Sequence, residues 1–322
     1  MSGVSFVVPV YNKAPHLDGV LRQIARQRGD FRRQYVFVDD GSTDGSLALL
    51  RELTRDWPDT LIEVQSNSGS AAATNRGVAL ATQPYVKFVD ADDLLTDDAT
   101  ETLLHALDGS DACLAFGHAA VFDPARTDLT RAAGSGEISR IAQPLWAAMQ
   151  NSLFNPTQCL IRTEAFRTVG GCDERVVFSQ EYSMTLRLAR RWPFLALDAT
   201  LAYLPQAETG RLSANEGRQL QRVTRAVALF LRDYPDTGWW LKQLACRRAA
   251  YRAWKYVHRR PHSPAWPLHP LFWRQVRPYL PFLSGQAEFV ERCAAVYDAA
   301  APVVAGGRPA ASVGLRGSDA SL

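Results

Sequence analysis

Short apolar runs alternate with amphipathic segments over the first 210 residues. Four runs rich in Val, Phe, Ile and Tyr are typical of buried strands: residues 4–10, 35–38, 61–64 and 85–89. Between them apolar residues recur at helical spacing, as at Leu17, Val20 and Leu21. This alternation predicts an α/β fold with a mostly parallel sheet and helices on both faces. A polar loop follows each strand, so we expect these loops to meet along one rim.

The same pattern, with interruptions, continues along the chain. Further strands are expected at residues 112–117, 158–162 and 194–204. Further helices are expected at residues 96–107, 138–151, 163–169 and 180–191. A basic, aromatic and helical stretch follows, and the Ala/Gly/Ser-rich end is typical of disorder. The predicted organisation is an α/β domain at 1–210, a C-terminal helical extension at 211–300 and a disordered tail at 301–322.

Composition narrows the class of protein. The formal net charge of +3 over 322 residues is too small to indicate a nucleic-acid partner. The five cysteines lack C-x-x-C spacing, which favours reduced thiols over a disulfide framework or a zinc site. No signal peptide precedes the first strand, and no apolar run reaches the ~20 residues of a membrane-spanning helix. We therefore expect a cytoplasmic protein.

The most informative stretch is VKFVDADD at residues 86–93, where an apolar run ends in three carboxylates. Clustered carboxylates repel one another and resist desolvation, so a cationic partner is expected. Mg²⁺ and Mn²⁺ prefer oxygen ligands, often one or two carboxylates plus substrate phosphates. The alternative is that Asp92 or Asp93 caps the N-terminus of the next helix.

Four polar groups would share the predicted rim: Pro9-Val10-Tyr11-Asn12, the DDGSTD segment at 39–44, Asn67 and Gly69 with the Asn75-Arg76 pair, and Asp90-Ala91-Asp92. Their order and spacing resemble family 2 glycosyltransferases, the inverting nucleotide-sugar enzymes of the GT-A fold. The resemblance is strong over the first third of the chain and weaker to about residue 205. It implies a Rossmann-like sheet in which residues 1–110 bind the nucleotide sugar and residues 111–210 supply the acceptor side and the base. Cell-envelope polysaccharide biosynthesis is the role it implies.

The resemblance also implies individual roles. Donor-binding residues would be Pro9, Tyr11, Asn12, Asp39, Asp40, Asn67, Gly69, Asn75, Arg76, Asp90, Ala91 and Arg211. The metal, Mn²⁺ or Mg²⁺, would bind Asp92, Asp90 and Glu208 and neutralise the departing diphosphate. The alternatives to donor binding by this segment are that Asp40 forms a turn and that Ser42 or Thr43 caps a helix.

Two departures from the family pattern affect these roles. The family often has an Arg one residue before the Asn, where this chain has Thr74, so Arg76 is the available cation. It also frequently has a metal-binding His after the last strand, where this chain has residues 205–211. Glu208, Gln206 or water would then complete the metal shell.

An inverting transfer requires a general base on the acceptor hydroxyl. In the family a Glu-Asp pair follows a Gly-Gly-Phe-Asp-Glu-like segment. This chain has GGCDE at 170–174 and then Gln180-Glu181, so the resemblance makes Glu181 the base. The alternative is that Glu181 is an acid on the helix surface that pairs with Arg187 or Arg190.

The resemblance favours a UDP-sugar as donor and a glycan or lipid-linked glycan as acceptor. The Gln-x-x-Arg-Trp motif of processive synthases is missing, which favours a single addition. The basic aromatic segment at 211–260 is either a solvated helix face or a contact with an anionic membrane at the inner face of the cell membrane. Two alternatives remain: a nucleotidyltransferase, although the first loop is not Gly-rich, and a nucleotide-sugar binding protein that has lost its base.

Overall fold

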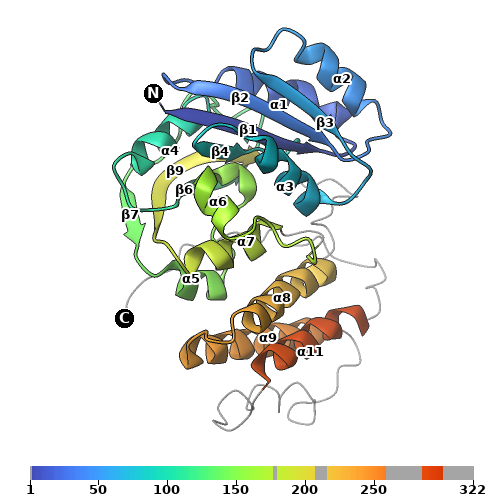
Figure 1. Ribbon diagram of the computed structural model, residues 1–322, viewed down its shortest axis with the longest axis vertical. Coiled ribbons are helices and arrows are strands. Elements are labelled where there is room, and N and C mark those ends of the chain that lie inside the picture. The colour runs from blue at the N-terminus through green and yellow to red at the C-terminus, as the bar shows by residue number, and fades with distance from the viewer. Residues whose placement is uncertain (1, 177–179, 207–215, 259–284, 300–322) are drawn as a thin grey trace.

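The computed structural model describes residues 2–176, 180–206, 216–258 and 285–299 (Figure 1). The nine described strands form one sheet in the order β3-β2-β1-β4-β8-β6-β9-β5, and β7 also pairs with β9. Their bounds are β1 Gly3–Val10, β2 Arg32–Asp39, β3 Thr60–Val64, β4 Tyr85–Phe88, β5 Leu94–Leu95, β6 Leu114–Val121, β7 Ile138–Ile141, β8 Cys159–Arg162 and β9 Phe194–Leu204.

The first half of the sheet, β3-β2-β1-β4, is entirely parallel. Val10 is in register with Asp39, which in turn is in register with Val64, so β1, β2 and β3 end at the same level. In the second half β8 runs antiparallel to both β4 and β6, while β6 and β9 are parallel. The α/β fold class is confirmed, and the rim formed by the strand ends is where the sequence places it.

Alternation along β1 explains why helices cover both faces. Val4, Phe6 and Val8 pack with α1, α2 and α4, whereas Val7 packs with α3, α6 and α7. The helix bounds are α1 Ala14–Ala25, α2 Ser46–Leu53, α3 Ser70–Leu80, α4 Ala99–Leu107, α5 Pro144–Gln150, α6 Thr163–Thr168 and α7 Gln180–Ala189. Full burial of a side chain such as Phe6 contributes roughly 1.5–3 kcal/mol, so this pattern fixes the strand register.

Three further helices extend the core away from the sheet: α8 Glu216–Asp233, α9 Trp239–His258 and α11 Gln286–Ala299. They lie beyond α5 and α7 in Figure 1, and one apolar cluster runs from Val7 through Met184 to Phe230 and Cys293. The helical extension therefore shares its core with the α/β layer. The domain boundary near residue 210 stays a prediction. No helix in the described part of the chain is both long and apolar enough to cross a membrane.

The helix predicted over residues 138–151 is wrong in its first half. Residues Ile138–Ile141 form β7, whose backbone pairs antiparallel with β9, and α5 begins only at Pro144. Local helical spacing was overridden there by an open edge of β9 and by a proline suited to a helix start. The short β5 strand was not expected either. The tail at 301–322 lies outside the described residues.

Candidate active site

The loops after β1 and β2 are bonded to each other at the rim. Asn12 adopts a left-handed backbone conformation with a φ of 52°. Its backbone amide donates to the Ser42 hydroxyl at 3.0 Å, and its side-chain oxygen accepts from the Thr43 amide at 2.8 Å. Asn tolerates this conformation better than most residues. Asn12 therefore shapes the wall of the rim by holding two strand ends together.

The two aspartates at the end of β2 have different surroundings, although both are buried. Asp40 accepts hydrogen bonds from the Ser68 and Gly69 amides at 2.8 and 2.9 Å, and it also accepts one from Gln65. It therefore fixes the loop between β3 and α3. Asp39 accepts from the Ser42 amide at 3.1 Å, but its Oδ1 has no hydrogen-bond partner within the described residues. A buried acceptor without a partner is costly, which favours Asp39 as the ligand-binding member of the pair.

The carboxylates after β4 lie around Thr157. The Thr157 hydroxyl donates to Asp93 at 2.7 Å and accepts from the Asp90 amide at 3.0 Å. Asp93 is buried, whereas Asp92 lies nearer the surface and pairs with the Lys13 ammonium at 2.5 Å. The alternative role as a helix cap is not observed, because α4 begins after Asp98.

A fully buried lysine lies behind these acids. Lys87 of β4 donates to the Thr157 and Phe88 carbonyl oxygens. Burial lowers the pKa of Lys87 to about 8, opposed by the nearby charges of Asp93 and Asp90. The sequence analysis did not select Lys87, although a lysine in an otherwise apolar strand is a signal that could have identified it.

Glu181 and Asp90 line the same cavity. This cavity has a volume of about 280 Å³ and is lined by Pro9, Thr74, Phe88, Asp90, Pro156, Cys172, Glu181 and Met184. Burial, reinforced by the nearby charge of Asp90, raises the pKa of Glu181 to about 7. A carboxylate with a pKa near neutrality is suited to accept a proton. The segments that carry Glu181 and Asp90 are far apart in sequence, and the fold brings them together.

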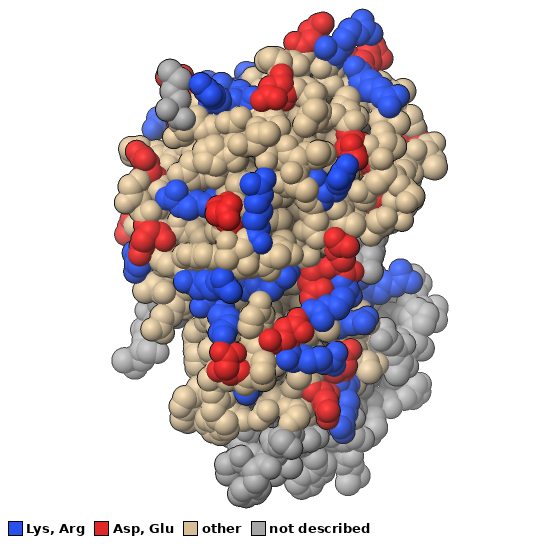
Figure 2. Space-filling view, in the orientation of Figure 1, with Lys and Arg blue, Asp and Glu red and all other residues tan. Residues whose placement is uncertain are grey.

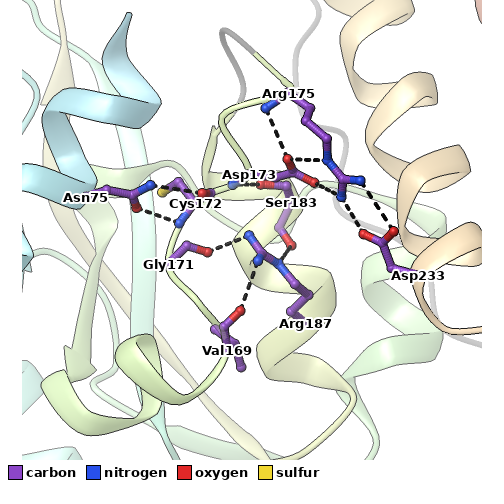
Figure 3. Close-up of polar contacts among 9 residues, drawn as sticks. All are labelled: Asn75, Val169, Gly171, Cys172, Asp173, Arg175, Ser183, Arg187 and Asp233. Atoms are coloured by element: carbon purple, nitrogen blue, oxygen red, sulfur yellow. Dashed lines mark hydrogen bonds and ion pairs between the residues drawn. The ribbon is translucent and has the colours of Figure 1, made fainter. Parts of the chain in front are cut away.

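The loop before α7 is held from three sides, as Figure 3 shows. Asn75 of α3 exchanges hydrogen bonds with the backbone of Cys172, at 2.7 Å to the amide and 3.0 Å to the carbonyl oxygen. Gly171 has a φ of +68°, and a Cβ there would lie 2.4 Å from the Asn75 side-chain oxygen. A glycine is therefore needed for this approach. Asn75 supports the cavity by fixing this loop.

The other two sides of the loop are held by α7 and α8. Arg187 donates to the carbonyl oxygens of Val169 and Gly171, so it does not pair with Glu181 (Figure 3). Arg175 pairs with Asp173 at 2.7 Å and also with Asp233 of α8. Arg190 pairs with Asp236. The alternative in which Glu181 pairs with Arg187 or Arg190 is thus not what the structure shows.

The remaining predicted residues fall into distinct groups. Tyr11 and Asn67 are exposed at the rim, and Ala91 is buried. The Gly69 amide is bonded to Asp40, and the guanidinium of Arg76 pairs with Glu63 on β3. Glu208 and Arg211 lie outside the described residues. Thr74, Pro156 and Met184 were not predicted as site residues. They belong to no recognisable motif, and they reach the cavity only because the fold brings distant segments together.

The oxygen ligands available for a divalent cation lie on the loop after β4. Among the residues that the structure describes, no three His, Cys, Asp or Glu side chains come together as a metal site. Asp90 and Asp92 provide oxygen ligands on one loop, and Asp92 already has a cationic neighbour in Lys13. Two carboxylates fit Mg²⁺ or Mn²⁺ when substrate phosphates and water complete the shell.

Comparison with known proteins identifies the family. Residues 5–170, slightly more than half of the chain, match the model described as Glycosyl transferase family 2. The chain therefore belongs to glycosyltransferase family 2. YibD, a glycosyltransferase of Escherichia coli K12, is 32% identical over 101 residues, which cover 31% of this chain and 29% of YibD. The chain spans less than two fifths of the length of such curated relatives.

Solved structures agree at the level of the fold. TarS 1–349 of Staphylococcus aureus in complex with UDP has a TM-score of 0.56 and 18% identity, covering 78% of this chain and 71% of that one. The mannosyltransferase PcManGT of Pyrobaculum calidifontis, in complex with GDP-Man and Mn²⁺, has a TM-score of 0.53 and 19% identity, covering 91% and 73%. The chain has a GT-A fold with additional C-terminal helices.

Proposed function

We propose that this protein is an inverting glycosyltransferase that moves a sugar from a nucleotide-diphosphate donor to an acceptor hydroxyl. The observation that carries the proposal is the cavity in which Glu181, with a pKa of about 7, lies near Asp90. Direct displacement requires a base on one side of the sugar and stabilisation of the leaving group on the other. These two residues supply candidates for both tasks.

The donor would bind along the rim formed by β1, β2 and β4. The free oxygen of Asp39 supports a hydrogen bond from the base or ribose, and Tyr11 and Pro9 border the same region. The sugar end of the donor would lie at this cavity, beside Asp90 and Glu181, with the nucleotide on the open rim. UDP is the favoured nucleotide, and the TarS structure contains UDP.

The diphosphate would lie over Asp90 and Asp92 together with Mn²⁺ or Mg²⁺. The cation supplies charge neutralisation for the departing diphosphate. Lys13 would bind the same phosphates, since its ammonium lies against Asp92. Of the other predicted metal ligands, Glu208 remains a proposal, as does Arg211 on the diphosphate.

Glu181 would act as the general base in a single addition. Its helix is fixed by the loop that Asn75 and Arg187 hold, so the carboxylate has a defined position. Burial keeps its pKa close to the working pH, where it accepts the acceptor proton as the bond to the sugar forms. The acceptor is proposed to be a glycan or a lipid-linked glycan.

Peripheral membrane contact is proposed at α9. Trp240 is 72% exposed and Trp239 is 43% exposed at the start of this helix. Indole rings favour membrane interfaces, and the nearby basic residues favour anionic lipids. However, acidic and basic side chains are interspersed on the face shown in Figure 2, and Asp233 and Asp236 are paired. The contact is therefore expected to be local to the tryptophans.

The proposal is tested by donor turnover with and without Mn²⁺. Asp92→Asn is expected to lower Mn²⁺-dependent turnover by roughly 100-fold or more, because it removes a metal carboxylate. Asp18→Asn is the matched control, since Asp18 pairs with Arg22 on the outside of α1 and forms no other ion pair among the described residues. Full turnover of Asp92→Asn would refute the metal role. Nucleotide binding without turnover on a broad acceptor panel would favour a binding protein instead.

A further inference from the structure

A second cavity lies on the other side of α7 from the proposed active site. Its volume is about 250 Å³, and it is enclosed by side chains of α5, α7, α8, α9 and α11. The lining is apolar apart from Tyr182, Thr224, Arg248 and Arg252. Glu181 faces the first cavity and the adjacent Tyr182 faces the second, so α7 separates the two.

The two arginines of this cavity lack acidic partners. Arg248 donates to the Met149 carbonyl oxygen at 2.9 Å and to the Asn151 side chain at 3.0 Å. Neither it nor Arg252 forms an ion pair within the part of the chain that the structure describes. Other arginines of this region differ, because Arg175, Arg190 and Arg225 each contact a carboxylate.

Both guanidinium groups are only partly exposed and lie near each other. Burial, together with the charge of Arg252, lowers the pKa of Arg248 to about 10. Burial likewise lowers the pKa of Arg252. At neutral pH both stay charged, so two partly desolvated like charges lie together with no ion-paired carboxylate among the described residues. That arrangement costs stability, which makes a binding role the better explanation.

We propose that this cavity binds a phosphate group. The planar guanidinium donates two parallel hydrogen bonds to phosphate, and a hydroxyl such as that of Thr224 adds a further polar contact. The lining carries two guanidinium groups and one threonine hydroxyl among apolar side chains, which favours a small anionic group as the ligand. Val223, Val227 and Val290 provide an apolar wall for the carbon chain of a phosphoester.

The phosphate has two chemical sources, a soluble phosphoester or the headgroup of an anionic lipid. In either case the ligand touches Tyr182 and thus packs against the helix that carries Glu181. Binding is therefore expected to stabilise α7. This inference concerns a site separate from the donor, so it does not depend on the transferase assignment.

The site is tested with the full chain by isothermal calorimetry against inorganic phosphate, with a chelator present to exclude metal-dependent donor binding. Arg252→Gln is expected to weaken phosphate binding at least about tenfold, because it removes a charge-assisted contact. Arg232→Gln is the matched control, since Arg232 is an exposed arginine of α8 outside the cavity. It is expected to bind phosphate like the native protein.

A stability measurement separates binding from folding. Without phosphate, Arg252→Gln is expected to melt at a temperature equal to or above that of the native protein, because a partly buried unpaired charge is removed. With phosphate, the melting temperature of the native protein and of Arg232→Gln should rise, whereas that of Arg252→Gln should not. Should Arg252→Gln fail to fold, Thr224→Val serves instead and is expected to weaken binding less strongly.

Flotation with vesicles distinguishes the two sources. Binding to phosphatidylglycerol vesicles but not to phosphatidylcholine vesicles, lost in Arg252→Gln, would assign the site to a lipid headgroup. Phosphate binding without flotation would assign it to a soluble phosphoester. Phosphate binding of equal strength in Arg252→Gln and the native protein would overturn the proposal, as would failure to bind both phosphate and phosphatidylglycerol.

Discussion

The two cavities on either side of α7 have opposite charge. The cavity toward the sheet contains Asp90 and Glu181, whereas the cavity toward α8 and α9 contains Arg248 and Arg252. In both, burial shifts the pKa against the charged form, upward to about 7 for Glu181 and downward to about 10 for Arg248. The shared effect is desolvation. Desolvation brings the pKa of Glu181 close to neutral pH, whereas the pKa of Arg248 stays well above it. Of these two cavities, the acid one is therefore suited to proton transfer.

The contrast extends to how each cavity is built. The acid cavity combines the ends of β1 and β4 with loop residues and with side chains of α3 and α7. The basic cavity is formed by helices alone, from residues at helical spacing such as Val223 and Val227, or Arg248 and Arg252. In the acid cavity the loop at Cys172 is held by hydrogen bonds to Asn75, whereas the helices around the basic cavity share an apolar core.

The largest expected effect comes from neutralising the acid of the first cavity. Glu181→Gln is expected to lower kcat by about 10²–10⁴-fold with little change in nucleotide affinity, because it removes the proposed base. Glu164→Gln in α6 is the control, as that acid is exposed. Transfer rates and calorimetric nucleotide binding measure the two quantities. A kcat within threefold of the native value would contradict the base assignment.

The pH dependence sharpens the same contrast. The base is active when deprotonated, and burial raises the pKa of Glu181 to about 7. The rate kcat/KM is therefore expected to rise with pH and to level off above a midpoint near 7. In Glu181→Asp, whose carboxylate is one methylene shorter, the midpoint should move and the plateau should fall, while Glu164→Gln leaves both unchanged. A flat profile between pH 6 and 8 would argue against a titrating base at this position.

The smallest effect is expected where α8 meets the loop before α7. Asp233→Asn removes one of the two carboxylates that Arg175 contacts, and both side chains are partly exposed. The free energy of unfolding is expected to fall by less than about 1 kcal/mol, as for other surface ion pairs. Denaturant titration and kcat measure the result, with Asp236→Asn as the control. A loss of kcat beyond tenfold would show that α8 positions Glu181 directly.

Much of the first half of the fold was predictable from sequence. The apolar runs at 4–10 and 85–89 correspond to β1 and β4, because parallel strands buried on both faces are nearly continuous in apolar residues. The strand at 194–204 matches β9 residue for residue. The helix expected over 138–151 failed at β7, where pairing with a distant strand outweighed local spacing.

The candidate site was likewise predictable from the sequence only in part. The residues of the rim, among them Asp39, Asp40 and Asp92, could be identified from motif spacing, since they follow their strands directly. The separate roles of these aspartates could not be predicted from motif spacing. Which aspartate holds a loop, and which has a free oxygen, depends on backbone amides that are distant in sequence.

By itself the sequence predicted the alternation of strands and helices, the acid cluster and Glu181 as the candidate base, because periodicity and motif spacing are local properties of the chain. The tertiary structure decided that Glu181 lies beside Asp90 and that Asn75 supports a loop. It also decided that Arg248 and Arg252 lie on the other side of α7, where no carboxylate of the described residues pairs with them. Burial and counter-charges are set by segments far apart along the chain, so the pKa values that bear on function exist only in the folded protein.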